Sequence, residues 1–285
     1  MKKIINQITI IIAVILVIVS CDKVNDVRDP NAEVIKGNRK VLVEDYTGHK
    51  CGNCPAAADT LKYLTKKYPG QVIALAIHAG FFANINTTTY PTDFRNSTGT
   101  AYDNQFGVSL AGNPNGLINR AGFGTGGFIK AYSTWEGSVA QMLTKQAKFE
   151  IKIKNIFATS NNNLNTTVTV RSLTSNSGIF KLVVLLSEDS IIAEQLDYSL
   201  PSGSQLVTNY EFNHVLRGAI NSTWGDPVFT IGAVANDSVV KNYTNYAINS
   251  GYNASKCHVI AYVYDADPTS PTYYEVLQVE EQKVK

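Results

Sequence analysis

Two cysteines separated by two residues stand where a predicted strand gives way to a predicted helix. The motif Cys51-Gly52-Asn53-Cys54 follows the β-branched segment 40–46, and Pro55 suits the first turn of a helix. Unpaired N–H groups and the helix dipole favour a thiolate at this position. A free thiol with a pKa of about 8.5 can fall to roughly 3.5–7.5 there. We therefore expect Cys51 to be the nucleophile and Cys54 to be the resolving thiol.

The segments around the cysteines predict a βαβ unit. Residues 40–46 form the first strand, and the almost continuously apolar run 71–77 is typical of a strand buried on both faces. Apolar residues at helical spacing indicate the helix between them: Ala57, Leu61, Leu64 and Tyr68. A Cys-x-x-Cys motif at the start of such a helix is a strong indication of redox chemistry, whereas the motif alone is a weak one.

The N-terminal segment predicts an exported lipoprotein. Two lysines precede the apolar stretch 8–19, which at about 12 residues is too short for a bilayer-spanning helix of roughly 20. Ser20-Cys21 after aliphatic residues resembles a lipobox, in which the cysteine is acylated and becomes the new N-terminus. We expect residues 1–20 to be a signal peptide, Cys21 to carry the lipid and 21–36 to be a tether. The alternative is an ordinary signal peptide with a cysteine at its boundary.

Cysteine usage and charge restrict the chemistry further. An oxidising compartment favours a disulfide between Cys51 and Cys54, either permanent or cycling. These two cysteines supply half of a tetrahedral zinc site, and neither Cys257 nor a histidine pair has a partnering spacing, so we expect no metal and no cofactor. Loss of Lys2 and Lys3 with the signal peptide leaves equal numbers of basic and acidic residues. This balance excludes an electrostatic footprint for nucleic acid.

The rest of the chain divides by its periodicity. Residues 80–105 are polar and indicate an insertion with a short helix over 98–106, and a helix over 134–146 follows. Beyond Lys148 the pattern has period two and predicts antiparallel strands in a β-sandwich. The segments with this pattern are 149–154, 166–170, 179–186 and 258–264, with a last strand over 273–279.

The segment 41–55 is similar to the active-site segment of thioredoxin-fold proteins, and Asn113-Pro114 before a strand is similar to their cis-proline loop. Residues 44–48 ahead of the cysteines, with the lipobox before them and a β-rich part after them, resemble the Omp28-related outer-membrane lipoproteins of Bacteroidetes. The expected architecture is an α/β thioredoxin-like domain over 37–147 followed by an all-β antiparallel sandwich domain over 148–285. The expected location is the outer membrane, facing the periplasm or the cell surface.

The thioredoxin resemblance implies further site residues. Asp45, six residues before Cys51, matches the buried carboxylate that accepts the proton of the resolving thiol, and burial would raise its pKa. Glu44 points to the opposite face of the strand, so only one of the two carboxylates can have this role, and Asp45 is preferred. Pro114 is implied to follow a cis peptide bond and to pack against the cysteines. The alternative is a trans turn proline.

The positions that flank the cysteines depart from the thioredoxin pattern. Lys50 replaces the usual aromatic residue, and Asn53 replaces the usual proline. Lys50 and His49 are candidates for adding positive potential, or they are ordinary surface residues. Because the intervening residues tune the reduction potential, the direction of the redox reaction stays open.

Two functions remain as hypotheses. The first is thiol-disulfide exchange on exported proteins by a membrane-anchored oxidoreductase that uses Cys51, Cys54, Asp45 and Pro114. The second is a non-enzymatic surface lipoprotein for adhesion or assembly, in which the same disulfide is structural. Fold alone does not choose between them.

Overall fold

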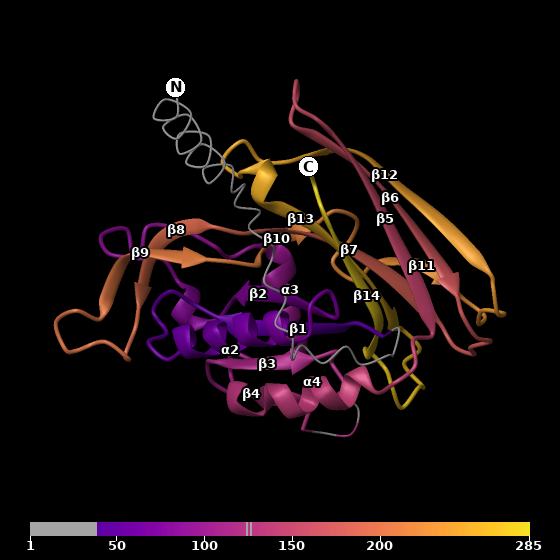
Figure 1. Cartoon of the computed structure of the whole chain (residues 1–285), viewed down its shortest axis with the longest axis horizontal. Helices are drawn as coiled ribbons and strands as arrows, with labels where there is room; N and C mark the ends of the chain where they lie inside the picture. The colour runs from indigo at the N-terminus through magenta and orange to yellow at the C-terminus, as the bar shows by residue number, and fades with distance from the viewer. Residues whose placement is uncertain (1–38, 124, 126) are drawn as a thin grey trace, which may run out of the picture. The chain divides into compact units, whose positions relative to one another are not determined.

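The computed structural model describes residues 39–285, except residues 124 and 126. These residues belong to one compact unit that is mostly β, with a nine-stranded mixed sheet and few helices (Figure 1). The sheet has the strand order β14-β13-β7-β10-β2-β1-β3-β4, and β11 pairs with β7. The expected signal peptide, the lipid-bearing Cys21 and the tether lie outside the described residues.

The N-terminal part supplies the middle and one edge of this sheet. Its elements are β1 (Val41–Thr47), α2 (Cys54–Lys67), β2 (Val72–His78), η1 (Phe81–Ala83), α3 (Ser97–Phe106), β3 (Asn115–Ile118), β4 (Ile129–Ala131), η2 (Tyr132–Thr134) and α4 (Trp135–Leu143). Strands β1 and β2 are parallel, and β3 is antiparallel to both β1 and β4. The predicted βαβ unit, the short helix of the insertion and the helix after it are confirmed, with bounds that differ by a few residues.

Side chains of β1 alternate between two hydrophobic clusters on opposite faces of the sheet. Val43 packs in the cluster that contains apolar residues of α2 and α4, whereas Tyr46 packs in the cluster that contains residues of α3. Because both faces are covered, every residue of β1 and β2 is buried. The alternation puts Asp45 on the α2 face and Glu44 on the α3 face.

The C-terminal part is entirely β apart from one short turn of helix. Its elements are β5 (Phe149–Ala158), β6 (Asn163–Ser172), β7 (Phe180–Glu188), β8 (Ile191–Leu196), β9 (Leu206–Phe212), β10 (Val215–Ala219), β11 (Asp226–Phe229), β12 (Ser238–Ala247), η3 (Ala254–Lys256), β13 (Cys257–Asp265) and β14 (Val276–Lys283). Strands β7, β10, β11, β13 and β14 extend the large sheet beyond β2. Strands β5, β6 and β12 form a separate three-stranded sheet, and β8 and β9 form a two-stranded hairpin.

The large sheet continues across the division that the sequence predicts between residues 147 and 148. Val215 of β10 is the parallel partner of Ala76 in β2, and the Ala76 amide donates to the His214 carbonyl at 2.8 Å. Strand β7 joins β10 on its other side and is buried along nearly its whole length. The expected division between residues 147 and 148 is therefore not a boundary between two sheets. Strand β10 of the C-terminal part pairs with the edge of β2 and continues the same sheet.

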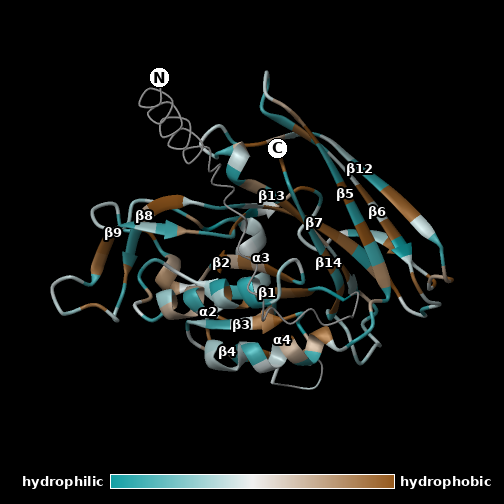
Figure 2. Ribbon diagram, in the orientation of Figure 1, coloured by the Kyte–Doolittle hydropathy of each residue, from teal (hydrophilic) through white to brown (hydrophobic). Residues whose placement is uncertain are grey.

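The three-stranded sheet packs one face against the large sheet. Phe149 and Val168 from the small sheet share a hydrophobic cluster with Leu182 and Val263 of the large sheet. Burial alternates along β6, and Figure 2 shows hydrophilic and hydrophobic residues interspersed along β5, β6 and β12. The period-two pattern of 149–154 and 166–170 thus belongs to antiparallel strands with one buried face, as predicted.

Candidate active site

The two cysteines of the motif form a disulfide at the start of α2. Their Cα atoms are 5.4 Å apart, and α2 begins at Cys54 with Pro55 in its first turn. The residue that caps the helix, Asn53, makes no side-chain hydrogen bond to it, and the first turn contains no acidic residue. No acidic side chain of the first turn therefore offsets the positive end of the helix dipole at the cysteines.

Both cysteines of the motif are buried. Cys51 retains 3% and Cys54 2% of its accessible surface. The physical reason is a cover formed by residues 195–198 at the end of β8. The amides of Leu196 and Tyr198 donate to the carbonyls of residues 49 and 52, each at 2.8 Å.

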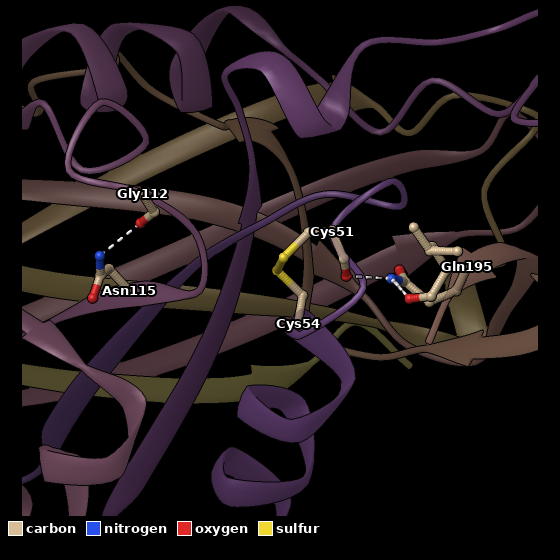
Figure 3. Close-up of a disulfide and its surroundings, with 6 residues drawn as sticks. Cys51, Cys54, Gly112, Asn115 and Gln195 are labelled. Carbon is tan, nitrogen blue, oxygen red and sulfur yellow. Dashed lines mark hydrogen bonds between the residues drawn. A yellow bond between two sulfur atoms is a disulfide. The ribbon is translucent and has the colours of Figure 1, made fainter. Parts of the chain in front are cut away.

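Two side chains complete this cover. Gln195 Nε2 donates to the Cys51 carbonyl at 3.0 Å, as Figure 3 shows. The Tyr198 ring lies against Gly52 so closely that a Cβ there would come within 2.5 Å of it. Glycine at this position therefore allows the cover to approach the cysteine motif. Nothing in the sequence pattern indicated the cover, because it comes from a strand 144 positions downstream.

Glu44 and Asp45 have opposite surroundings. Glu44 accepts two hydrogen bonds from Arg120, at 2.6 and 2.8 Å, and Arg120 also donates to the Tyr262 hydroxyl at 2.9 Å. Asp45 is 2% exposed, and its Oδ1 has no hydrogen-bond partner among the described residues. Burial raises the Asp45 pKa from 3.8 to about 7. The Asp45 carboxyl can therefore exchange a proton near neutral pH.

A cavity of about 440 Å³ connects Asp45 with the inner cysteine. It lies between α2, the ends of β1 and β2, and the segment that joins β9 to β10. Its walls include Asp45, Thr47, Cys54, Pro55, Ala58, Asp59, Lys62, Ala76, His78, Gln195, Tyr210, Glu211, Phe212, Asn213 and His214. The expected proton acceptor and the expected resolving thiol thus face one shared space.

His78 is a buried residue in the wall of this cavity, and the local sequence pattern did not indicate a role for it. It is 2% exposed, and neither ring nitrogen has a partner in the described part of the chain. Its ring lies 4.7 Å from the Phe94 ring and 5.5 Å from the Phe212 ring, measured between centroids. The signal available in the sequence was one polar residue directly after the apolar run 71–77.

Pro114 follows a cis peptide bond, as the sequence resemblance implied. It directly precedes β3, whose residue Asn115 is the partner of Tyr46 in β1. The proline loop therefore lies at the end of the sheet where β1 leads into the cysteine motif. The Asn115 side chain closes this loop by donating to the Gly112 carbonyl at 2.6 Å (Figure 3).

The two basic residues before Cys51 have different surroundings. His49 is 1% exposed, stacks on Tyr90 at 5.0 Å, and its Nε2 lies 3.1 Å from the Asn84 carbonyl. Burial lowers the His49 pKa, so the ring is neutral near pH 7 and adds no positive charge. Lys50 places its ammonium 5.0 Å from the centroid of the Phe81 ring. Of the two residues, Lys50 alone supplies a positive charge beside the cysteines.

A family model described as outer membrane protein Omp28 matches residues 99–285. The chain belongs to the Omp28 family. The matched region contains Pro114, Arg120 and Gln195, whereas the two cysteines precede it. Membership of the Omp28 family confirms the resemblance seen in the sequence and supports an outer-membrane location.

Two solved structures share the fold of this Omp28 family member. HBP35 of Porphyromonas gingivalis has a TM-score of 0.63 at 16% identity, covering 87% of this chain and 76% of that chain. A protein from Agrobacterium tumefaciens has a TM-score of 0.50 at 14% identity, covering 88% of this chain and 96% of that chain. The search of curated proteins found no match. At these identities the likeness concerns the fold alone.

The third cysteine within the described residues of this Omp28 family member lies apart from the site. Cys257 is an unpaired, fully buried residue of the core formed by β7, β13 and the three-stranded sheet. Burial raises the Cys257 pKa to about 12, so it stays a neutral thiol. Within residues 39–285, apart from the two undescribed positions, no three His, Cys, Asp or Glu side chains gather as a metal site. The same described part contains no helix long and apolar enough to cross a membrane.

Proposed function

We propose that this Omp28 family member is a lipid-anchored envelope protein whose thioredoxin-like N-terminal domain performs thiol-disulfide exchange on exported proteins. One observation carries the proposal: the Cys51–Cys54 pair stands at the start of α2, and the unpartnered Asp45 carboxyl faces the same cavity as Cys54. A buried carboxyl without a partner destabilises a fold, and such groups cluster at functional sites. A purely structural disulfide needs no acid beside it.

The helix terminus supports attack by Cys51 once the disulfide is reduced. Free N–H groups of the first turn and the uncapped dipole favour the thiolate form of a cysteine placed there. The ammonium of Lys50 adds positive potential nearby. Cys51 therefore has the electrostatic surroundings of a nucleophile.

In the reducing direction, the Cys51 thiolate attacks one sulfur of a disulfide in an exported protein. This step forms a mixed disulfide and releases the first substrate thiolate. Asp45, as the carboxylate, accepts the proton of the Cys54 thiol, and the Cys54 thiolate then attacks the Cys51 sulfur. The Cys51–Cys54 disulfide forms, the second substrate thiolate leaves, and both released thiolates take protons from water. Two electrons pass to the substrate, and the reverse sequence oxidises a substrate dithiol.

The proposed domain comprises β1, α2, β2, α3, β3, β4 and α4. Its thioredoxin-like character is supported by the βαβ unit, the cysteine motif at the helix start and the cis bond before Pro114. Pro114 precedes β3 at the end of the sheet where β1 leads into the cysteine motif, and in this proposal it offers backbone for substrate pairing. We propose that the C-terminal strands belong to a second functional region, although β10 and β7 continue the same sheet.

The lipid on Cys21 forms a separate part of the proposal. The aliphatic stretch before Ser20-Cys21 and membership of an outer membrane family both support it. A Cys21→Ser variant should lose its acyl chains and leave the membrane fraction, as shown by mass spectrometry of the mature N-terminus and by fractionation. An unmodified Cys21 in the membrane-bound wild type would contradict the lipid anchor.

The competing function is adhesion or assembly by a non-enzymatic surface lipoprotein. In that case the same disulfide only stabilises the fold. This function is favoured by the cover over Cys51, because a residue with 3% exposure is shielded from protein substrates. The two functions differ in one respect that can be observed. Only an exchange enzyme forms covalent adducts through Cys51.

Trapping of adducts in cells tests the proposal. A Cys54→Ser variant cannot resolve mixed disulfides, so reducible adducts through Cys51 should accumulate on non-reducing gels. The double variant Cys51→Ser/Cys54→Ser is the matched control, because it lacks the nucleophile and removes the disulfide equally. If the single variant forms no more adducts than the double variant, the disulfide is structural and the exchange function is wrong.

A further inference from the structure

A second proton-carrying side chain lines the cavity behind the cysteines. His78 ends β2, and its ring is almost completely withdrawn from solvent. Neither ring nitrogen has a hydrogen-bond partner among the described residues. A buried imidazole normally satisfies at least one nitrogen, and an unpaired one destabilises the fold. The ring therefore needs an occupant of the cavity as its partner.

The strand register puts His78 beside Asp45. Asp45 pairs with Ala76, and Thr47 pairs with His78, in two adjacent parallel strands. Asp45 and His78 are thus diagonal neighbours on the face of the sheet that carries α2. Both line the cavity that also contains Cys54, and its volume of about 440 Å³ accommodates several water molecules. Water between the carboxyl and the ring would satisfy both groups.

The groups around His78 explain its charge state. Burial, His49 and Arg217 lower the His78 pKa to about 3, and Asp93 opposes them weakly. The other titratable groups of the cavity wall are Asp45, Asp59, Lys62, Tyr210, Glu211 and His214. Near pH 7 the ring is neutral and has one donor and one acceptor nitrogen. Such a ring accepts a proton at one nitrogen while it releases another proton from the other.

We propose that His78 is a positioning residue that passes protons, through cavity water, between Asp45 and the solvent. This inference rests on the proposed exchange function. After Asp45 has taken the Cys54 proton, the carboxyl gives that proton to a cavity water. This water protonates one nitrogen of His78, and the other nitrogen releases a proton outward. One proton reaches solvent, the Asp45 carboxylate is restored, and His78 is again neutral.

A synthetic aromatic disulfide such as dithionitrobenzoate separates the two chemical steps. Mixed in excess with the reduced full-length protein, it releases one coloured thiolate when Cys51 attacks and a second when Cys54 resolves the mixed disulfide. In wild type the rate of the second release should rise with pH through about 7, following ionisation of Asp45. In His78→Leu the second release should slow roughly tenfold below pH 7, while the first release is unchanged.

Chemical rescue distinguishes a proton relay from a structural role. His78→Ala enlarges an open cavity that then admits free imidazole, which should restore the second release in a concentration-dependent manner. In His78→Gln the side chain stays polar but cannot relay protons, so the second release should stay slow. This variant keeps the test valid if His78→Leu misfolds. His258→Gln, on β13 outside the cavity, is the matched control and should behave as wild type.

The outcomes separate the two proposals. The role of His78 would be overturned, without affecting the exchange function, by either of two results. One is a rate of second release in all His78 variants that equals the wild-type rate at every pH. The other is a slow second release that imidazole does not restore. Absence of a second release in wild type would overturn both proposals. Failure to trap adducts in cells would overturn the exchange function on exported proteins, whereas the His78 assay, which uses a synthetic disulfide, would still report on proton transfer at the cysteines.

Discussion

The Gln195 side chain donates a hydrogen bond of 3.0 Å to the Cys51 carbonyl. The same nitrogen lies 2.7 Å from the Leu196 carbonyl, which fixes the amide over the cysteine motif. With the backbone bonds of Leu196 and Tyr198, this contact holds residues 195–198 against the disulfide. A substrate can reach Cys51 only after this cover has moved, so its stability should set the access rate.

Removal of the Gln195 amide should expose the disulfide more often. Gln195→Ala loses about 0.5–1.5 kcal/mol of hydrogen bonding, which corresponds to a rise of up to roughly tenfold in local opening. Reduction by dithiothreitol, followed by thiol quantitation, should accelerate accordingly. Gln205→Ala, in the same hairpin but bonded to the Leu200 carbonyl, is the control. Equal reduction rates in wild type and Gln195→Ala would rule out the cover as the barrier.

A side chain at position 52 should displace the cover sterically. In Gly52→Ala the new Cβ would come within 2.5 Å of the Tyr198 ring, so we expect faster reduction and a lower Tm. Adding Tyr198→Ala removes the obstructing ring and should recover part of the lost stability. The two substitutions should therefore be strongly non-additive in a double-mutant cycle. Additive effects would show that Gly52 and Tyr198 do not constrain each other.

The neighbouring acids of β1 should respond oppositely to neutralisation. Glu44→Gln breaks the fully buried pair with Arg120 and should lower the free energy of unfolding by about 3–5 kcal/mol. Asp45→Asn removes an unpartnered carboxyl and should leave stability at pH 8 unchanged or higher. Denaturant unfolding at pH 8 compares the two variants directly. Equal destabilisation by both substitutions would contradict these different surroundings.

The pH dependence of stability should reveal the buried Asp45. Burial raises its pKa from 3.8 to about 7, so the folded protein holds this proton more tightly than the unfolded chain. Its contribution to stability is therefore complete below about pH 4 and is lost as pH rises to about 7, by roughly 4 kcal/mol. The difference in unfolding free energy between Asp45→Asn and wild type should grow over this interval and then level off. A constant difference would show that Asp45 titrates normally.

The sequence by itself determined the features that depend on nearby residues. The βαβ unit, the start of α2 at the cysteines and the opposite directions of Glu44 and Asp45 follow from hydrophobic periodicity and helix-start signals. The resemblance to known families added the cis bond before Pro114 and the Omp28 assignment. Residues 149–154 and 166–170 likewise form strands because one face is buried and the other is polar.

Only the tertiary structure decided how distant segments meet. The Arg120 partner of Glu44, the cover from residues 195–198, the shared cavity of Asp45 and His78, and the pairing of β10 with β2 all join positions far apart in the chain. Hydrophobic periodicity reports that a strand is buried, but it does not identify the strand that lies beside it, since many apolar partners satisfy the same pattern. For that reason the sequence predicted that the cysteines lie at the start of a helix, but it did not indicate that residues 195–198 cover them.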